Sequence, residues 1–325
     1  MNRFIKFIFR LLFLLIIATI VFFFWASSST LKEAEYVSLT KVDVQNQSKN
    51  DSIFSVVTYN IGYLSGMTNN RPIAKLKSLF DENLQKVLAE TQKVNPSIIA
   101  FQEIDYDATR SYNINQEEQI AQLGFPYRAR TINWDEHYVP FPYWPISMHF
   151  GKVVSGQSII SKYPIKEQQR IVLQRVEDAP FYRNAFYLER LAQVVKVVLN
   201  NKEIMVINVH LEAFDKATRL KQFDEVVKLF NQYKKQYATI LLGDFNSEAN
   251  DTSAVIQKMF AMKDVGNAAF NIDEIENTFD SKSPYKRIDY IFYTKNSIEY
   301  ISGKVLNEFE EASDHLPVFM EFKLR

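Results

Sequence analysis

The sequence predicts a layered α/β or α+β sandwich, and three observations lead to this fold class. Apolar runs that suit strands alternate with stretches in which apolar residues recur at helical spacing. Two apolar runs, 191–199 and 203–209, flank the turn-forming pair Asn200-Asn201 and therefore predict an antiparallel hairpin. A hairpin among mixed strands and helices argues against a doubly wound parallel sheet.

The individual elements follow from the same patterns. Apolar residues at helical spacing predict amphipathic helices over residues 75–94 and 216–235. Residues 125–150 are rich in aromatic residues and proline, and this composition predicts an irregular loop. The remaining predicted strands are residues 53–59, 97–102, 158–161, 238–242, 288–293 and 317–322.

The N-terminal segment differs in composition from the rest of the chain. Residues 11–25 are apolar except for Thr19, and Arg3, Lys6 and Arg10 precede them. We expect an uncleaved transmembrane anchor, with a cleaved signal peptide as the alternative. In both cases the basic residues stay in the cytoplasm and the rest of the chain is exported.

These features predict three parts of the chain. Residues 1–26 are the anchor or signal peptide, and residues 27–51 are a polar tether with little apolar periodicity. Residues 52–325 form the folded domain. The whole chain contains 47% hydrophobic and 23% charged residues, a balance that is typical of a globular protein. The chain has no cysteine, which excludes disulfides, thiolate metal sites and a cysteine nucleophile.

Polar residues follow apolar runs at five places. A single such residue is more typical of a turn or a surface histidine, so their joint occurrence carries the argument. Carboxylate, carboxamide and imidazole groups that converge from separate strand ends suit an oxygen-ligated cation and a proton-transfer group. The five places are Asn60, Gln102-Glu103, Asn208 with His210, Asp244 with Asn246, and Ser313-Asp314-His315.

Taken in order, these segments resemble the endonuclease/exonuclease/phosphatase superfamily over about residues 53–323. This group includes pancreatic-type deoxyribonucleases, apurinic endonucleases, neutral sphingomyelinases and inositol polyphosphate 5-phosphatases. His210 matches the second histidine of the deoxyribonuclease and sphingomyelinase branches, which apurinic endonucleases usually lack. The segments that carry the resemblance are TYN, QE, NVHLEA, GDFNS, RIDYIF and SDHLPV.

The resemblance implies a four-layer sandwich, in which two mixed, mainly antiparallel β-sheets pack face to face and helices flank them. It also implies a metal site, with Glu103 as the main Mg²⁺ ligand and with Asn60 and Asp314 nearby; Mn²⁺ or Ca²⁺ are alternatives. His315 is expected to act on the attacking water or to bind a phosphoryl oxygen, and Asp289 to orient it.

Four further residues receive roles from the same resemblance. Asp244 is expected to assist proton transfer or the nucleophile, and Asn246 to hold a phosphate oxygen. His210 is expected to be catalytic, and Arg190 to contact the phosphate from the start of the hairpin.

The expected function is therefore a Mg²⁺-dependent phosphoesterase that hydrolyses a phosphodiester outside the cytoplasm. The substrate is a phospholipid headgroup or a nucleic acid, and the anchor and the aromatic residues 125–150 favour the headgroup. An exported endonuclease is the alternative, and a catalytically inactive binding module at the envelope is a remote one. The membrane is an expected partner through the N-terminal helix, and no obligate protein partner is evident.

Overall fold

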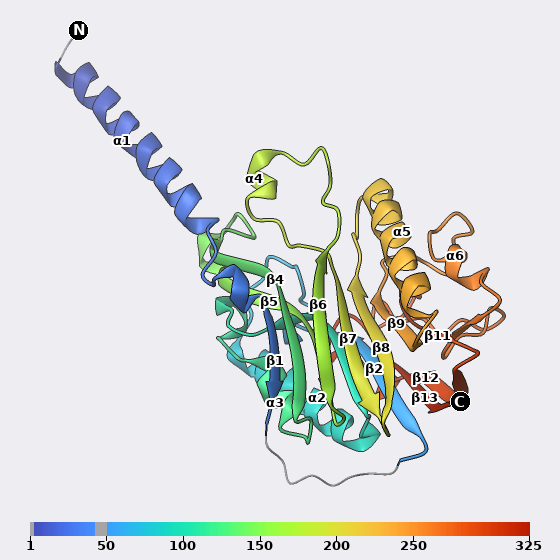
Figure 1. The fold of residues 1–325 in the computed structure, drawn as a ribbon. Helices are drawn as coiled ribbons and strands as arrows, with labels where there is room; N and C mark the ends of the chain where they lie inside the picture. The colour runs from blue at the N-terminus through green and yellow to red at the C-terminus, as the bar shows by residue number, and fades with distance from the viewer. Residues whose placement is uncertain (1–2, 43–50) are drawn as a thin grey trace.

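The fold is seen in a computed structural model that describes residues 3–42 and 51–325 (Figure 1). Thirteen strands of these residues form two sheets. The seven-stranded sheet has the order β1 (Val37–Lys41), β4 (Tyr127–Val139), β5 (Gly151–Ser161), β3 (Ile98–Asp105), β2 (Phe54–Asn60), β13 (Val318–Leu324) and β12 (Ile298–Val305). The six-stranded sheet has the order β10 (Val265–Asn267), β11 (Asp289–Thr294), β9 (Ala238–Asp244), β8 (Lys202–His210), β7 (Leu191–Leu199) and β6 (Ile165–Val172).

The two sheets pack face to face and carry helices on their outer faces. Apolar residues of both sheets form the core between them, including Val56, Ile159 and Val206. A second apolar cluster joins α2 to the seven-stranded sheet, and a third joins α5 and α6 to the six-stranded sheet. The predicted four-layer sandwich is therefore confirmed. The α-helices are α1 (Arg3–Ala26), α2 (Lys77–Val94), α3 (Gln116–Ala121), α4 (Phe181–Asn184), α5 (Lys216–Tyr233) and α6 (Gln257–Phe260).

Each sheet contains one pair of parallel strands, and the two strands of each pair finish at the same end of the sandwich. β2 runs parallel to β3, and β8 runs parallel to β9, whereas the other neighbours are antiparallel. The last residues of β8 and β9, His210 and Asp244, are therefore register partners. Asp289 begins the antiparallel β11 opposite Asp244. Titratable residues from separate strands thus meet at the same end of the sheet.

A glycine allows β8 and β9 to approach closely just before this end. Gly243 has φ +137°, and a Cβ added there would lie 2.0 Å from the carbonyl oxygen of Val209 on β8. A side chain at this position would push the two strands apart. The glycine of the GDFNS segment is therefore needed to keep Asp244 beside His210.

The prediction of an irregular loop over residues 125–150 is wrong for its first half. Residues 127–139 form β4, which pairs with β5 on one side and β1 on the other. The strand is held by long-range pairing, which the aromatic and proline content of the segment does not reveal. Residues 140–150 do connect β4 to β5 without a further strand.

The N-terminal region also differs from the predicted tether. β1, within residues 27–51, pairs with β4 and belongs to the seven-stranded sheet. Residues 43–50 lie outside the described part of the chain. α1 projects away from the domain (Figure 1) and is the one helix among the described residues that is long and apolar enough to cross a membrane, a test that signal sequences also pass.

Candidate active site

The candidate site lies in a cleft of about 920 Å³ at the end of the sandwich where the parallel pairs finish. Both sheets contribute to its walls. Predicted residues that line it are Glu103, Arg190, His210, Asp244, Asn246, Asp314 and His315. Asp289 and Asn60 lie directly behind this wall, because each is hydrogen bonded to a residue that lines the cleft.

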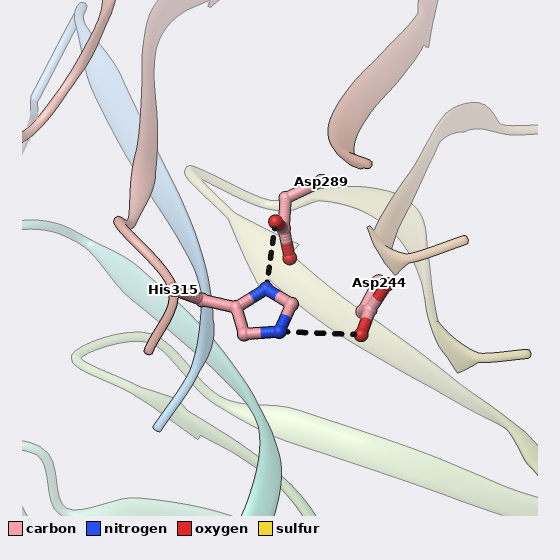
Figure 2. A group of neighbouring side chains, drawn as sticks. All are labelled: Asp244, Asp289 and His315. Atoms are coloured by element: carbon pink, nitrogen blue, oxygen red, sulfur yellow. Dashed lines mark hydrogen bonds and ion pairs between the residues drawn. The ribbon is translucent and has the colours of Figure 1, made fainter. Parts of the chain in front are cut away.

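His315 lies between two carboxylates from neighbouring strands (Figure 2). Its Nδ1 is 3.0 Å from Oδ2 of Asp289, and its Nε2 is 3.9 Å from Oδ2 of Asp244. The hydroxyl of Thr278 donates to the same Asp289 oxygen at 2.6 Å. Since all three members of the group are buried, their mutual orientation is fixed by these contacts.

The charges of this group shift two pKa values. Burial acts to lower the pKa of His315, but the carboxylates of Asp289 and Asp244 outweigh it and raise that pKa well above its usual value. Burial and the neighbouring Asp289 raise the pKa of Asp244 to about 7. The site therefore favours an imidazolium paired with Asp289, beside a carboxyl group that can exchange a proton near neutral pH.

The carboxylate of Asp244 accepts hydrogen bonds from two segments. The side-chain amide of Asn60 donates to its Oδ2 at 3.1 Å, and the backbone N–H of Asn246 donates to its Oδ1 at 2.9 Å. Asn246 has φ +48°, a conformation that Asn tolerates better than most residues. Its side-chain amide donates to the carbonyl of Leu211, so its oxygen can still accept a hydrogen bond.

The side chain of Asn60 is hydrogen bonded to the carboxylate of Asp244. Its oxygen accepts a hydrogen bond from the N–H of Gly62 at 3.1 Å, while its amide nitrogen faces Asp244. The metal contact predicted for Asn60 would use the remaining lone pair of that oxygen.

Glu103 and Asp314 form a second acidic group in the cleft. The amide nitrogen of Asn69 donates to Oε2 of Glu103 at 3.0 Å and to both carboxylate oxygens of Asp314 at 3.3 Å. Burial and the nearby Asp314 raise the pKa of the Glu103 carboxyl group. Two carboxylates around one neutral amide suit a divalent cation, because an oxygen-ligated cation would offset their repulsion.

The group of Asp244, Asp289 and His315 described above is another possible cation site, because one ligand atom from each residue lies within 4.8 Å of the others. Two of its atoms, His315 Nδ1 and Asp289 Oδ2, are already paired with each other. The Glu103–Asp314 group fits a cation better, because its carboxylates share only an amide donor.

His210 and Arg190 form the other wall of the cleft. Nη1 of Arg190 donates to Nε2 of His210 at 2.6 Å, so this ring nitrogen is the acceptor. Burial and the charge of Arg190 lower the pKa of His210 well below its usual value. His210 Nε2 also lies 3.5 Å from Asp244 and 3.7 Å from Glu103, so the ring stands between the two acidic groups of the cleft.

The sequence patterns missed three residues of the site. Asn69 precedes α2 in an irregular segment, and Thr278 lies in a loop before β11, so neither follows a recognisable strand. The ring of Phe279 lies 5.0 Å from that of His315. Only a conserved spacing or a fold could have indicated them.

Two polar residues of the sequence pattern serve the structure instead. Gln102 and Asn208 lie between the sheets, where the Gln102 amide donates to the Asn208 oxygen at 2.6 Å. Asn208 also donates to the carbonyl of Phe101. This buried contact joins β3 to β8 one residue before Glu103 and two residues before His210, and so helps to fix the spacing of these two residues.

Comparisons with known proteins agree with this fold. The model of the endonuclease/exonuclease/phosphatase family matches residues 57–315. No curated protein sequence matches the chain. An endonuclease/exonuclease/phosphatase of Beutenbergia cavernae is similar in structure with a TM-score of 0.59 and 19% identity, covering 84% of this chain and 72% of that one.

Two animal proteins share the fold. The catalytic domain of human Nocturnin, with a bound sulfate anion, has a TM-score of 0.60 and 17% identity, covering 91% of this chain and 100% of that one. TDP2 of D. rerio, in complex with a single-strand DNA product, has a TM-score of 0.58 and 15% identity, covering 84% of this chain and 100% of that one.

Proposed function

The chain belongs to the endonuclease/exonuclease/phosphatase family, and from this premise we propose that it is a Mg²⁺-dependent phosphodiesterase of the membrane surface. Members of the family are metal-dependent hydrolases that act on phosphoester bonds. The observation that carries the proposal is the placement of His315, paired with Asp289, in the same cleft as the Glu103–Asp314 group.

Glu103 and Asp314 would hold the divalent cation, with Asn60 close by. A cation bound there supplies positive charge that stabilises the charge developing on the phosphoryl oxygens. The imidazolium of His315 faces the cleft through Nε2 and donates a hydrogen bond to a phosphoryl oxygen, while Asp289 fixes its orientation.

Asp244 is the best-placed acceptor for a proton of the attacking water. Its pKa of about 7 matches the demands on a general base at neutral pH, and its Oδ2 lies within reach of both His315 and His210. Asn246 and Arg190 line the same cleft and would hold the other oxygens of the phosphate.

Two substrate classes fit this chemistry. A phospholipid headgroup is favoured by α1, which would anchor the domain on the outer side of the membrane as an uncleaved helix. A nucleic acid is favoured by the bound DNA product in the similar TDP2 structure, and an exported endonuclease is therefore the second candidate. The Lys residues that line the cleft are paired with acidic residues, for example Lys286 with Glu248. They therefore contribute little net positive charge for binding the phosphate backbone of a nucleic acid.

The test uses the full chain in detergent micelles, with Mg²⁺ or with EDTA. Plasmid DNA, RNA, sphingomyelin, phosphatidylinositides and a chromogenic diester are assayed side by side. We expect Mg²⁺-dependent hydrolysis of at least the chromogenic diester, and its loss in His315→Ala but not in the matched control His149→Ala, which lies outside the cleft. A folded protein that hydrolyses none of these substrates would overturn the proposal.

A further inference from the structure

The domain end that holds the cleft also exposes a group of large apolar side chains. They come from two loops, residues 140–150 between β4 and β5 and residues 173–190 between β6 and β7. Their exposed fractions are high for residues of this kind, and we call the group the aromatic face. It consists of Tyr143 (70%), Trp144 (76%), Ile146 (62%), Phe181 (76%) and Tyr182 (50%).

The aromatic face is continuous with the end of α1. The ring of Phe23 lies 5.9 Å from that of Phe181 and 5.6 Å from that of Phe186 in the second loop. Phe22 lies 5.6 Å from Tyr138 at the end of β4, next to the first loop. The second loop therefore meets α1 near the point where the helix leaves the domain, and the first loop begins two residues after Tyr138. Figure 1 shows α1 projecting from the end of the domain that carries these loops.

The connection from α1 to the domain is fixed by hydrogen bonds. The N–H groups of Thr30 and Leu31 donate to the Asp135 carboxylate, each at 2.9 Å. The carbonyl of Ser28 accepts from the N–H of His137 at 3.0 Å, and Ala26 is buried. α1 thus leaves the domain in one direction instead of hanging on a free tether.

The catalytic cleft shares this end of the molecule. The second loop ends at Arg190, which contacts His210 in the cleft, and the hydroxyl of Tyr187 in the same loop donates to Glu212 just beyond β8. The first loop leads into β5, whose residue Ser155 pairs with Asp105 on β3. Asp105 is two residues after Glu103, so this loop lies at the same end of the sandwich as the cleft. The same end of the sandwich therefore carries α1, both loops and the cleft.

The physical properties of α1 identify what covers the aromatic face. A helix of 24 residues is about 36 Å long, enough to cross the hydrocarbon layer of a bilayer. Trp and Tyr side chains prefer the layer where hydrocarbon meets lipid headgroups. The aromatic face lies where this layer would begin, beside the last turn of the helix.

We propose that the aromatic face is inserted into the headgroup layer of the bilayer that α1 crosses, which holds the catalytic cleft at the lipid surface in a fixed orientation. This inference rests on the proposed anchoring role of α1, but it does not depend on catalysis. The occupant of the face is lipid, and a protein partner or open water are the alternatives that the test must separate.

The experiment takes advantage of a chain that has no cysteine. Single cysteines are introduced into the full chain as Trp144→Cys and Phe181→Cys, with Leu15→Cys within α1 and Lys235→Cys as controls. Lys235 is exposed and precedes β9, at the opposite end of the sandwich from Asp244. Each variant is labelled with a nitroxide, placed in phosphatidylcholine nanodiscs, and its accessibility to oxygen and to a water-soluble nickel chelate is compared by EPR.

We expect the labels at 144 and 181 to favour oxygen over the nickel chelate severalfold more than the label at 235, and the label at 15 to favour it most. If the labels at 144 and 181 match that at 235 while 15 is lipid-exposed, α1 is an anchor and the docking proposal is wrong. Protection from both agents would indicate a protein contact and would also overturn it. Water access at 15 would overturn both the anchor and the docking. Because no substrate is used, these outcomes are separate from a failure of the proposed hydrolysis.

Thermal melting followed by circular dichroism checks that each cysteine variant is folded. Trp144 and Phe181 are mostly exposed, so their replacement by cysteine removes little packing, and we expect melting temperatures close to that of the parent chain. A variant that does not fold is replaced by one at the neighbouring exposed position, Tyr143→Cys or Tyr182→Cys.

Discussion

The two acidic groups of the cleft differ in how completely the protein itself compensates their charge. Asp289 is paired with the His315 imidazole and with the Thr278 hydroxyl, so this group is assembled before any substrate arrives. Glu103 and Asp314 share the single amide of Asn69. The difference supports the proposal that the first group, which we call the relay, is preorganised to transfer a proton and to stabilise charge, whereas the second group needs a cation to complete it.

The largest expected effect comes from removing the relay. His315→Ala deletes the group that lies between Asp289 and Asp244, and we expect kcat for the chromogenic diester to fall by about 10²–10⁴-fold. The measurement is steady-state hydrolysis at saturating Mg²⁺, with His149→Ala as the matched control. A loss of less than about tenfold, or roughly 1.4 kcal/mol of barrier, would show that the relay is not at the reaction centre.

The second prediction separates the two groups by the sign of their effect on stability. Glu103→Gln removes one of two repelling carboxylates, so in EDTA we expect it to raise the free energy of unfolding. Asp289→Asn leaves the buried His315 without its charged partner, and we expect it to lower that free energy.

The measurement is urea denaturation of both variants, with and without Mg²⁺. Stabilisation of the parent chain by Mg²⁺ should shrink in Glu103→Gln, because the cation loses a ligand. If Mg²⁺ stabilised Glu103→Gln as strongly as the parent, the cation would lie elsewhere, and the Asp244, Asp289 and His315 set would be the next candidate.

A third prediction concerns pH in the metal-free protein. The pKa of Asp244 is about 7 in the folded chain, above its ordinary value of 3.8, so the folded state binds the proton more tightly than the unfolded state. Its contribution to stability is therefore present at low pH and is lost as the pH rises from about 4 to 7, with a slope of up to about 1.4 kcal/mol per pH unit.

Asp244→Asn removes this titration while keeping the shape of the side chain. In EDTA, we expect the stability of the variant to fall less steeply than that of the parent between pH 4 and 7, as measured by urea denaturation at several pH values. Parallel curves for the two proteins would contradict the raised pKa and would remove the argument for Asp244 as a base.

The comparison of the two groups also explains what the sequence could predict. Asp244 and Glu103 were predicted because each follows an apolar run, and such runs become strands whose ends meet. Asp289 was predicted only from the resemblance to the family. Asn69 was missed because it lies in an irregular segment and acts only through a fold that brings it to Glu103 and Asp314.

The same limit applies to the fold. The long helices α2 and α5 and the β7–β8 hairpin depend on local patterns, and they were predicted nearly to their bounds. The short helices α3, α4 and α6 were not predicted. β1 and β4 depend on pairing with strands far along the chain, and local composition suggested a tether and a loop there. The docking of α1 through Asp135 is likewise a long-range contact with no local signal.

The smallest expected effect tests how rigid the relay is. The ring of Phe279 lies 5.0 Å from that of His315 on the side of the cleft, and an aromatic contact of this kind contributes about 0.5–1.5 kcal/mol. For Phe279→Leu we therefore expect a two- to tenfold loss of kcat, with KM for the diester and the response to Mg²⁺ unchanged. Tyr285→Leu, which alters an exposed ring in contact with Phe279, is the matched control and should retain parent activity. A change in Mg²⁺ affinity in Phe279→Leu would show that the two acidic groups are coupled more closely than their separate hydrogen bonds suggest.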